Sequence, residues 1–197
     1  MLFVVDEVRG VTVLDNIMYV ICDRSSTIRL YNTDTCSPLD AVIHVEGMID
    51  PQDIVVCRDD RQLYVADWDD PTDGSYDTDW SYGWSSIWRV SCDDHSYVKW
   101  LTTESRMPAF APDTALSLTS RRLLVTSWWS GRRLRQYSTT DRQLLRDVEL
   151  PQYVGCVLHG VETTRGTFVV GHRGTSHDQL LQSAVSELLT VIIASKL

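Results

Sequence analysis

Carboxylate side chains are concentrated in one segment of this chain, where they could bind a metal ion. Six aspartates occur among the fourteen residues Asp67–Trp80, and carboxylate oxygens are ligands that calcium prefers. Their spacing differs from that of an EF-hand loop. A loop starting at Asp69 has Pro71 at its third position and Trp80 where the bidentate glutamate belongs. We therefore expect an acidic loop with aromatic contacts here, no metal site and no cofactor.

Other residues able to do acid–base or metal chemistry are spread along the chain: Asp53, Asp113 and His159. A carboxylate or an imidazole can accept a proton, but catalysis also needs partners at a suitable spacing. The sequence contains no Gly-x-Ser-x-Gly elbow, no P-loop and no His-Glu-x-x-His motif. We therefore predict that the chain is not an enzyme and has no catalytic residues.

These residues are positioned by a strand pattern that recurs along the chain. The segment Gln62–Asp67 reads QLYVAD, and three further segments alternate in the same way: Ile17–Cys22, Leu123–Ser127 and Thr167–Gly171. Their anchor residues lie 45, 60 and 44 positions apart: Tyr19, Tyr64, Leu124 and Phe168. A period near 45 residues with several short strands is typical of β-propeller blades. The longer middle interval indicates an insertion at about residues 69–84.

Apolar alternation and the turn sequences between the runs predict four strands in each of the first three repeats. The first repeat has Gly10–Leu14, Ile17–Ile21, Thr27–Asn32 and Ala41–Val45. The second has Gln52–Val56, Gln62–Ala66, Ser86–Ser91 and Tyr97–Thr102. The third has Thr114–Leu118, Arg122–Ser127, Arg133–Ser138 and Leu144–Glu149. A fourth repeat begins with Cys156–Glu162 and Thr167–Gly171.

The C-terminal segment admits two interpretations. Ser176 and Gln179 have the spacing of a helix-capping box, and apolar residues between Leu180 and Ile193 follow helical spacing. Alternatively, Ala184–Leu188 is the third strand of a fourth blade, after an enlarged loop. The local pattern favours the helix and the repeat favours the strand, so both stay open.

One repeat carries a resemblance to a known family. Pro51–Val56, Leu63–Asp67 and Ile87–Val90 resemble one unit of the NHL-repeat family of β-propellers, with its proline-led inner strand and its Y-V-A-D second strand. The first and third repeats match more loosely, since Cys22 and Ser127 stand where the family has aspartate. The resemblance covers about residues 8–174 and implies an all-β fold with blades of four antiparallel strands.

The resemblance also sets the expected domain organisation. Family members commonly form closed six-bladed rings, whereas this chain holds about three and a half blades. We expect blades at about 8–47, 48–102, 110–150 and 151–174 onward, with 175–197 as an incomplete fourth blade or an amphipathic tail. A partial ring exposes two apolar blade faces to water. The chain is then a fragment of a longer propeller, a half that pairs with another copy as a homodimer, or a small closed ring.

In an antiparallel blade, the start of the inner strand and the end of the second strand lie at the same end. The inner-strand starts carry Arg9, Asp53, Asp113 and His159, and the second strands are followed by Asp23, Arg24, Trp68, Trp128, Trp129, His172 and Arg173. Tryptophan and arginine are enriched in the hot spots of protein interfaces. We therefore predict a rim that binds a protein or peptide. Alternatively these tryptophans pack between blades, as we expect of Trp88 and Trp100.

Three functions follow from this organisation. The first is a non-enzymatic interaction platform that uses the tryptophan-bearing rim. The second, which some members of the NHL-repeat family imply, is RNA binding, but the formal net charge of −9 makes nucleic acid an unfavoured partner. The third is a calcium-dependent lactonase or esterase, as in six-bladed rings of related shape. That activity would require a further Glu or Asn ligand, and Arg9 places a positive charge among the candidate ligands.

Composition points to a reducing compartment. The five cysteines form no Cys-x-x-Cys pair, and several stand within apolar strand runs. The N-terminal residues lack the basic region and apolar core of a signal peptide, and no apolar run reaches the roughly 18 residues that span a bilayer. We expect a cytoplasmic protein that contacts no membrane. The terminal Ser195-Lys196-Leu197 makes a peroxisomal location the alternative.

Overall fold

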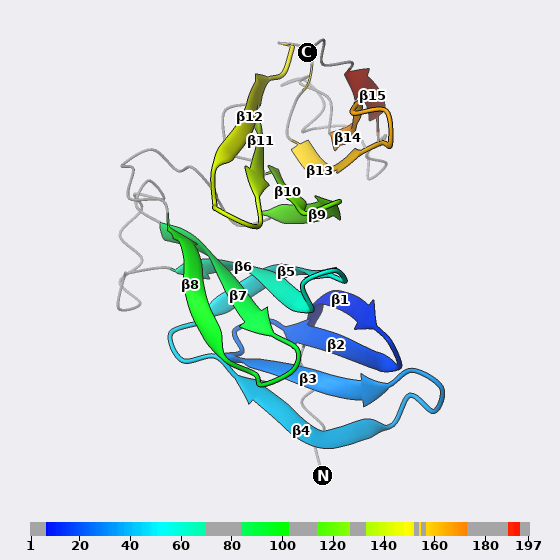
Figure 1. Cartoon of the computed structure of the whole chain (residues 1–197), viewed down its shortest axis with the longest axis vertical. Helices are drawn as coiled ribbons and strands as arrows, with labels where there is room; N and C mark the ends of the chain where they lie inside the picture. The colour runs from blue at the N-terminus through cyan, green and yellow to red at the C-terminus, as the bar shows by residue number, and fades with distance from the viewer. Residues whose placement is uncertain are drawn as a thin grey trace, which may run out of the picture. The chain divides into compact units, whose positions relative to one another are not determined.

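The computed structural model describes residues 7–69, 84–102, 114–126, 133–151, 154, 157–172 and 189–193. Within these ranges the regular elements are β-strands, which form antiparallel sheets with neighbours in sequence order (Figure 1). None of the described residues belongs to a helix that could cross a membrane. The prediction of an all-β chain built from propeller blades is confirmed.

Four sheets make up the described part of the chain, and we number them as blades 1 to 4. Blade 1 contains β1 (Val8–Leu14), β2 (Ile17–Cys22), β3 (Thr27–Asn32) and β4 (Pro38–His44). Blade 2 contains β5 (Asp50–Cys57), β6 (Gln62–Asp69), β7 (Trp84–Ser91) and β8 (Tyr97–Thr102). Blade 3 contains β9 (Ala115–Thr119), β10 (Arg122–Thr126), β11 (Arg133–Ser138) and β12 (Leu144–Glu149). Blade 4 contains β13 (Val157–Glu162), β14 (Phe168–His172) and β15 (Leu189–Ile193).

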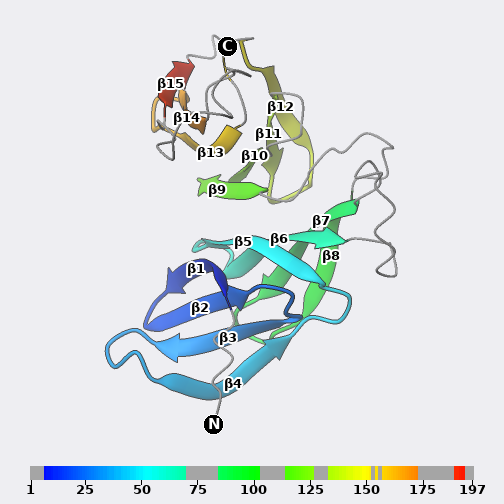
Figure 2. The same cartoon turned by 180° about the vertical axis from the view of Figure 1, so that it is seen from behind.

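The chain divides into two compact units, Met1–Pro108 and Ala109–Leu197. The first unit holds blades 1 and 2, and the second holds blades 3 and 4. Within the first unit the inner strands β1 and β5 lie side by side (Figures 1 and 2). Within the second unit β9 and β13 pack in the same way.

The C-terminal segment contributes a strand where it is described. Leu189–Ile193 forms β15, which pairs antiparallel with β14 through Phe168↔Ile193 and His172↔Leu189. The helical interpretation of these residues is therefore wrong, and the strand interpretation is correct in kind. The strand lies later than Ala184–Leu188, which is outside the described residues. Pairing with the edge of β14 satisfies backbone groups along that strand, and this outweighs the local helical spacing.

Blades 1, 2 and 4 share a β-bulge near the start of the inner strand. The pairing skips Arg9 between Val8↔Cys22 and Gly10↔Ile21. It skips Gln52 in blade 2 and Leu158 in blade 4 in the same way. A bulge bends a strand and redirects the side chains around it. The shared bulge also gives a reference point from which equivalent residues of these blades can be counted.

This register corrects one anchor of the repeat. Gly171 pairs with His159, the first residue after the bulge, as Ala66 pairs with Asp53 in blade 2. Counting back, Val169 occupies the position of Tyr64, so the predicted anchor Phe168 is one residue too early. Three apolar residues follow one another in Phe168–Val170, and such a run does not fix which side chains point to which face.

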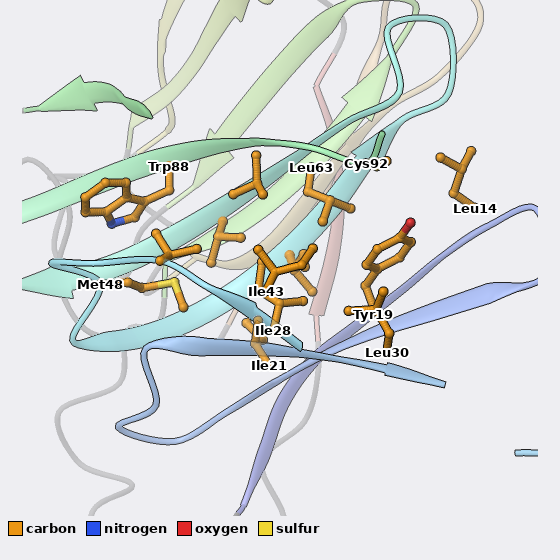
Figure 3. Packing of buried hydrophobic residues seen from close by; sticks show 14 residues of the cluster. Leu14, Tyr19, Ile21, Ile28, Leu30, Ile43, Met48, Leu63, Trp88 and Cys92 are labelled. Atoms are coloured by element: carbon orange, nitrogen blue, oxygen red, sulfur yellow. The ribbon is translucent and has the colours of Figure 1, made fainter. Parts of the chain in front are cut away.

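Blades 1 and 2 enclose the core of the first unit (Figure 3). Blade 1 contributes Tyr19, Ile21 and Ile28, which are at most 1% exposed, and blade 2 contributes Leu63 and Val65, which are fully buried. Gly10 allows the inner strands to approach closely. A Cβ at Gly10 would lie 3.0 Å from Ile54 Cγ2 and 3.1 Å from the Ile54 backbone nitrogen.

Blades 3 and 4 enclose a second core, which contains a buried carboxylate. Leu124 and Leu134 of blade 3 pack with Phe168 and Val170 of blade 4. Beside them Glu162, on β13, accepts hydrogen bonds from Gln136 Nε2 at 2.7 Å and Arg146 Nη1 at 3.2 Å. It also forms an ion pair with Arg122 Nη2 at 3.3 Å. This network joins the two blades of the second unit by polar as well as apolar contacts.

Candidate interaction surface

The bulge at Arg9 places its guanidinium beside Asp23, which follows the end of β2. Arg9 donates from Nε at 2.9 Å and from Nη2 at 2.6 Å to Asp23 Oδ1. The Asp23 backbone N–H in turn donates to the Glu7 carbonyl at 2.8 Å. The hydrogen bond that Arg9 donates to Asp23 raises the pKa of Arg9, so this side chain stays a cation. Both side chains are about one-third exposed (33% and 28%), so the pair is accessible from solvent.

Asp50 connects this pair with blade 2. Its Oδ1 accepts a hydrogen bond of 3.4 Å from the backbone N–H of Arg24, which also follows β2. Asp50 is the first residue of β5, so the end of one blade's second strand meets the start of the next blade's inner strand. Burial raises the pKa of Asp50, against a smaller lowering by the Arg24 hydrogen bond. The predicted juxtaposition of inner-strand starts and second-strand ends is therefore present in the first unit.

Asp67 holds the segment that leads into β5. Its side chain is 2% exposed and accepts hydrogen bonds from the backbone N–H groups of Ile49 (3.1 Å) and Asp50 (2.8 Å). It also accepts one from the Trp88 indole N–H at 3.0 Å. The aspartate of the Y-V-A-D sequence is thus a structural carboxylate, with its charge compensated by three donors. It fixes the backbone on which Ile49 and Asp50 are displayed.

Two apolar residues adjoin Asp50, one across the sheet and one along the chain. Trp68 pairs with Asp50 across the blade and is half-buried. Ile49, immediately before Asp50, is 45% exposed although it is a large aliphatic residue. An exposed aliphatic side chain and an accessible indole among charges have the composition of an interface hot spot. We call this set the blade 1–2 rim: Arg9, Asp23, Arg24, Ile49, Asp50 and Trp68.

Sequence reasoning missed Ile49 and Asp50. It counted the inner strand from Gln52, whereas β5 begins at Asp50 and bulges at Gln52. Pro51 was the available signal. A proline-led strand places the residues before the proline at the end of the blade, beside the residues that follow the second strand.

The other predicted site residues lie elsewhere. Asp53 is half-buried, and its Oδ1 accepts from the Ile54 backbone N–H at 2.8 Å. His159 is exposed, but it lies on the face of β13 that points away from blade 3. His172 is 1% exposed, so its side chain is not displayed on a surface. Four predicted site residues lie outside the described ranges: Asp113, Trp128, Trp129 and Arg173.

Trp88 and Trp100 have the packing role expected of them. They are 6% and 2% exposed, respectively. Trp100 makes an edge contact with Tyr64 at a centroid distance of 5.2 Å.

Among the residues that the structure describes, no group of three or more His, Cys, Asp or Glu side chains could hold a metal ion. The blade 1–2 rim combines an ion pair, hydrogen-bonding groups and an exposed aliphatic side chain.

Comparison with known proteins places the fold. No protein-family profile matches the sequence, and no curated protein matches it either. Among solved structures, a chain of Kuenenia stuttgartiensis hydrazine synthase matches with a TM-score of 0.67 at 15% identity, over 96% of this chain and 51% of that chain. The WD40 β-propeller domain of Doa1 matches with a TM-score of 0.54 at 14% identity, over 85% and 48%.

A chain of a nidogen/laminin complex matches with a TM-score of 0.58 at 13% identity, over 86% of this chain and 58% of that one. This chain spans about half the length of these three chains. Identities this low show the fold alone. Together with the four antiparallel sheets, they show that the chain forms blades of a partial β-propeller.

Proposed function

We propose that this chain is a non-enzymatic β-propeller module that binds a protein or peptide through the blade 1–2 rim. The observation that carries the proposal is the 45% exposure of Ile49 next to Asp50, the residue that pairs with Trp68 and accepts a hydrogen bond from Arg24 at the end of blade 1 that holds the Arg9–Asp23 pair. Burying an aliphatic side chain and an indole supplies apolar free energy, and nearby charged groups give orientation. One propeller neighbour was solved in a complex of two proteins, nidogen and laminin, which supports the same kind of role.

The rim favours a partner segment that has an apolar anchor residue and polar groups on both sides. Ile49 is presented on a backbone held by the buried Asp67, so little order has to be gained on binding. Arg9 and Asp23 are already paired and can be engaged from solvent through their remaining hydrogen-bonding capacity. The net charge of −9 favours a neutral or basic segment over nucleic acid.

Panning of the full chain against a displayed peptide library tests the proposal. We expect a selected peptide to bind wild type at least tenfold more tightly than Trp68→Ala or Ile49→Ser. Val98→Ser is the matched control, because Val98 is 38% exposed on the outer strand β8. The proposal fails if selected peptides bind the two rim variants and the control equally well. Retention of RNA at low salt by the wild type would support the RNA-binding alternative instead.

A further inference from the structure

Blade 2 has a face that packs on blade 1, and its equivalent in blade 1 is exposed in part. On blade 2 the packed face contains Ile54 (2% exposed), Leu63, Val65 and Val90 (all fully buried). Counting from the shared bulge, the equivalent residues of blade 1 are Val11, Met18, Val20 and Tyr31. These residues lie on the face of blade 1 that points away from blade 2.

Several apolar side chains on this face are exposed. Val8, Val11 and Val42 are 55%, 49% and 54% exposed, respectively, whereas Ile54 and Pro51, at the positions of Val11 and Val8, are buried. Val42 joins the same face because it pairs with Arg29, the partner of Val20. We call this surface the blade 1 end face: Val8, Val11, Val13, Met18, Tyr31 and Val42. The same face also carries the buried Val20 and Cys22 and the charged Arg29. Its apolar residues stand at positions that pack on a neighbouring blade in blade 2.

Blade 4 carries the opposite kind of uncovered face. Phe168, Val170 and Glu162 point toward blade 3, so the alternate residues of β13 and β14 point away from it. These are His159, Val161, Val169 and Gly171, which we call the blade 4 end face. Val161 is 39% exposed.

The blade 4 end face matches the surface that blade 1 uses to cover blade 2. Val161 and Val169 stand at the positions of Thr12 and Tyr19. The cross-strand pair His159↔Gly171 stands at the position of Gly10↔Ile21. In blade 4 the large residue is on the inner strand and the glycine on the second strand, whereas in blade 1 the arrangement is the reverse. The combined volume of that pair is thereby roughly conserved, which keeps the surface suitable for packing on a neighbouring blade.

We propose that the blade 4 end face of one copy packs on the blade 1 end face of a second copy, and reciprocally. The partner is a second copy because, within the chain, a face like the blade 1 end face is covered by the opposite face of a neighbouring blade. The blade 4 end face is a covering face of this type, and it is exposed. The contact repeats the packing of β1 on β5 and of β9 on β13. Two reciprocal contacts give a closed symmetric dimer, which leaves neither end face in water.

Light scattering coupled to size exclusion tests the proposal on the full chain. The wild type should have twice the chain mass of 22.5 kDa. Val11→Glu and Val161→Glu should each yield monomers, because each charge falls in both contacts of the dimer. Val42→Glu provides a second disruption of the blade 1 end face at an exposed site, in case Val11→Glu unfolds. Val98→Glu, on neither end face, should remain dimeric, and circular dichroism should report β-sheet in every variant.

Mixing two variants identifies which faces meet. Val11→Lys and Val161→Glu should be monomeric alone and dimeric together, because the mixed dimer has one wild-type contact and one Lys–Glu contact. A monomeric wild type would overturn the proposal, whether the faces stay exposed or close on one another within one copy. Dimers that survive in Val11→Glu, Val42→Glu and Val161→Glu would overturn it as well. So would failure of the mixture to reassociate.

Discussion

The indole N–H of Trp88 donates to the buried carboxylate of Asp67 at 3.0 Å. The same carboxylate accepts the backbone N–H groups of Ile49 and Asp50, so one side chain connects the second strand, the third strand and the entry to the inner strand of blade 2. The rim residues Ile49 and Asp50 therefore depend on a core contact. Stability and binding are expected to be coupled through this carboxylate.

Replacing Asp67 should destabilise the first unit strongly. Asp67→Ala leaves three buried or half-buried donors without their acceptor, and we expect the free energy of unfolding to fall by about 3 kcal/mol or more. Asp67→Asn keeps one carbonyl acceptor and should cost less. Urea denaturation measures both, with Asp40→Ala on the exposed part of β4 as the control. A loss for Asp67→Ala no larger than that for the control would contradict the role assigned to this carboxylate.

Replacing Glu162 should loosen the contact between blades 3 and 4. Glu162→Gln removes the charge that faces Arg122 and Arg146, and we expect a loss of about 1–3 kcal/mol. Hydrogen exchange should accelerate in β13 and β14 before it does in blades 1 and 2. Glu149→Gln, an exposed position on β12, is the matched control. Equal exchange in the two variants would show that the buried network contributes nothing to this contact.

Asp50 should make stability depend on pH. Because burial raises the pKa of Asp50, the folded protein binds this proton more tightly than the unfolded chain does. The stability that this bound proton contributes is fully present below the pKa of Asp50 in the unfolded chain. It is lost as the pH rises through the pKa of Asp50 in the folded protein. Relative to Asp50→Asn, the wild type should therefore lose stability between acid and neutral pH. Thermal unfolding of both proteins across this range measures the difference, and parallel curves would rule the effect out.

Arg9 should matter more for binding than for folding. Its ion pair with Asp23 is partly exposed, and exposed pairs contribute at most about 1 kcal/mol. Arg9→Ala should therefore change the free energy of unfolding by less than about 1 kcal/mol while weakening the binding of a selected peptide several-fold. Denaturation and calorimetric titration of the same preparation separate the two effects. Unchanged affinity would exclude Arg9 from the binding surface.

The sequence predicted the strands well because each carries its own alternation and its own turns. Thr27–Asn32 and Tyr97–Thr102 are placed to the residue. It placed Phe168 one position early, since an apolar triplet has no alternation to read. The strand at Leu189–Ile193 depends on pairing with β14, a contact distant in sequence. The spacing of apolar residues within the segment cannot indicate such a contact.

The site was predictable only in part. Arg9, Asp23 and Arg24 follow from the rule that inner-strand starts meet second-strand ends. Asp50 and Ile49 depend on a bulge, which a regular strand pattern does not reveal. His172 was expected on the rim, yet it stands at the buried position of Asp67 in blade 2. A polar residue type alone does not distinguish a displayed side chain from a buried one.

Hydrogen exchange of the full chain, with and without a panned peptide, tests whether the blade 1–2 rim is the binding surface. We expect the peptide to slow exchange at Asp23–Arg24 and Ile49–Asp50, and Trp68→Ala to abolish this protection. Protection confined to blades 3 and 4, or protection at the rim that persists in Trp68→Ala with unchanged affinity, would contradict binding through the blade 1–2 rim.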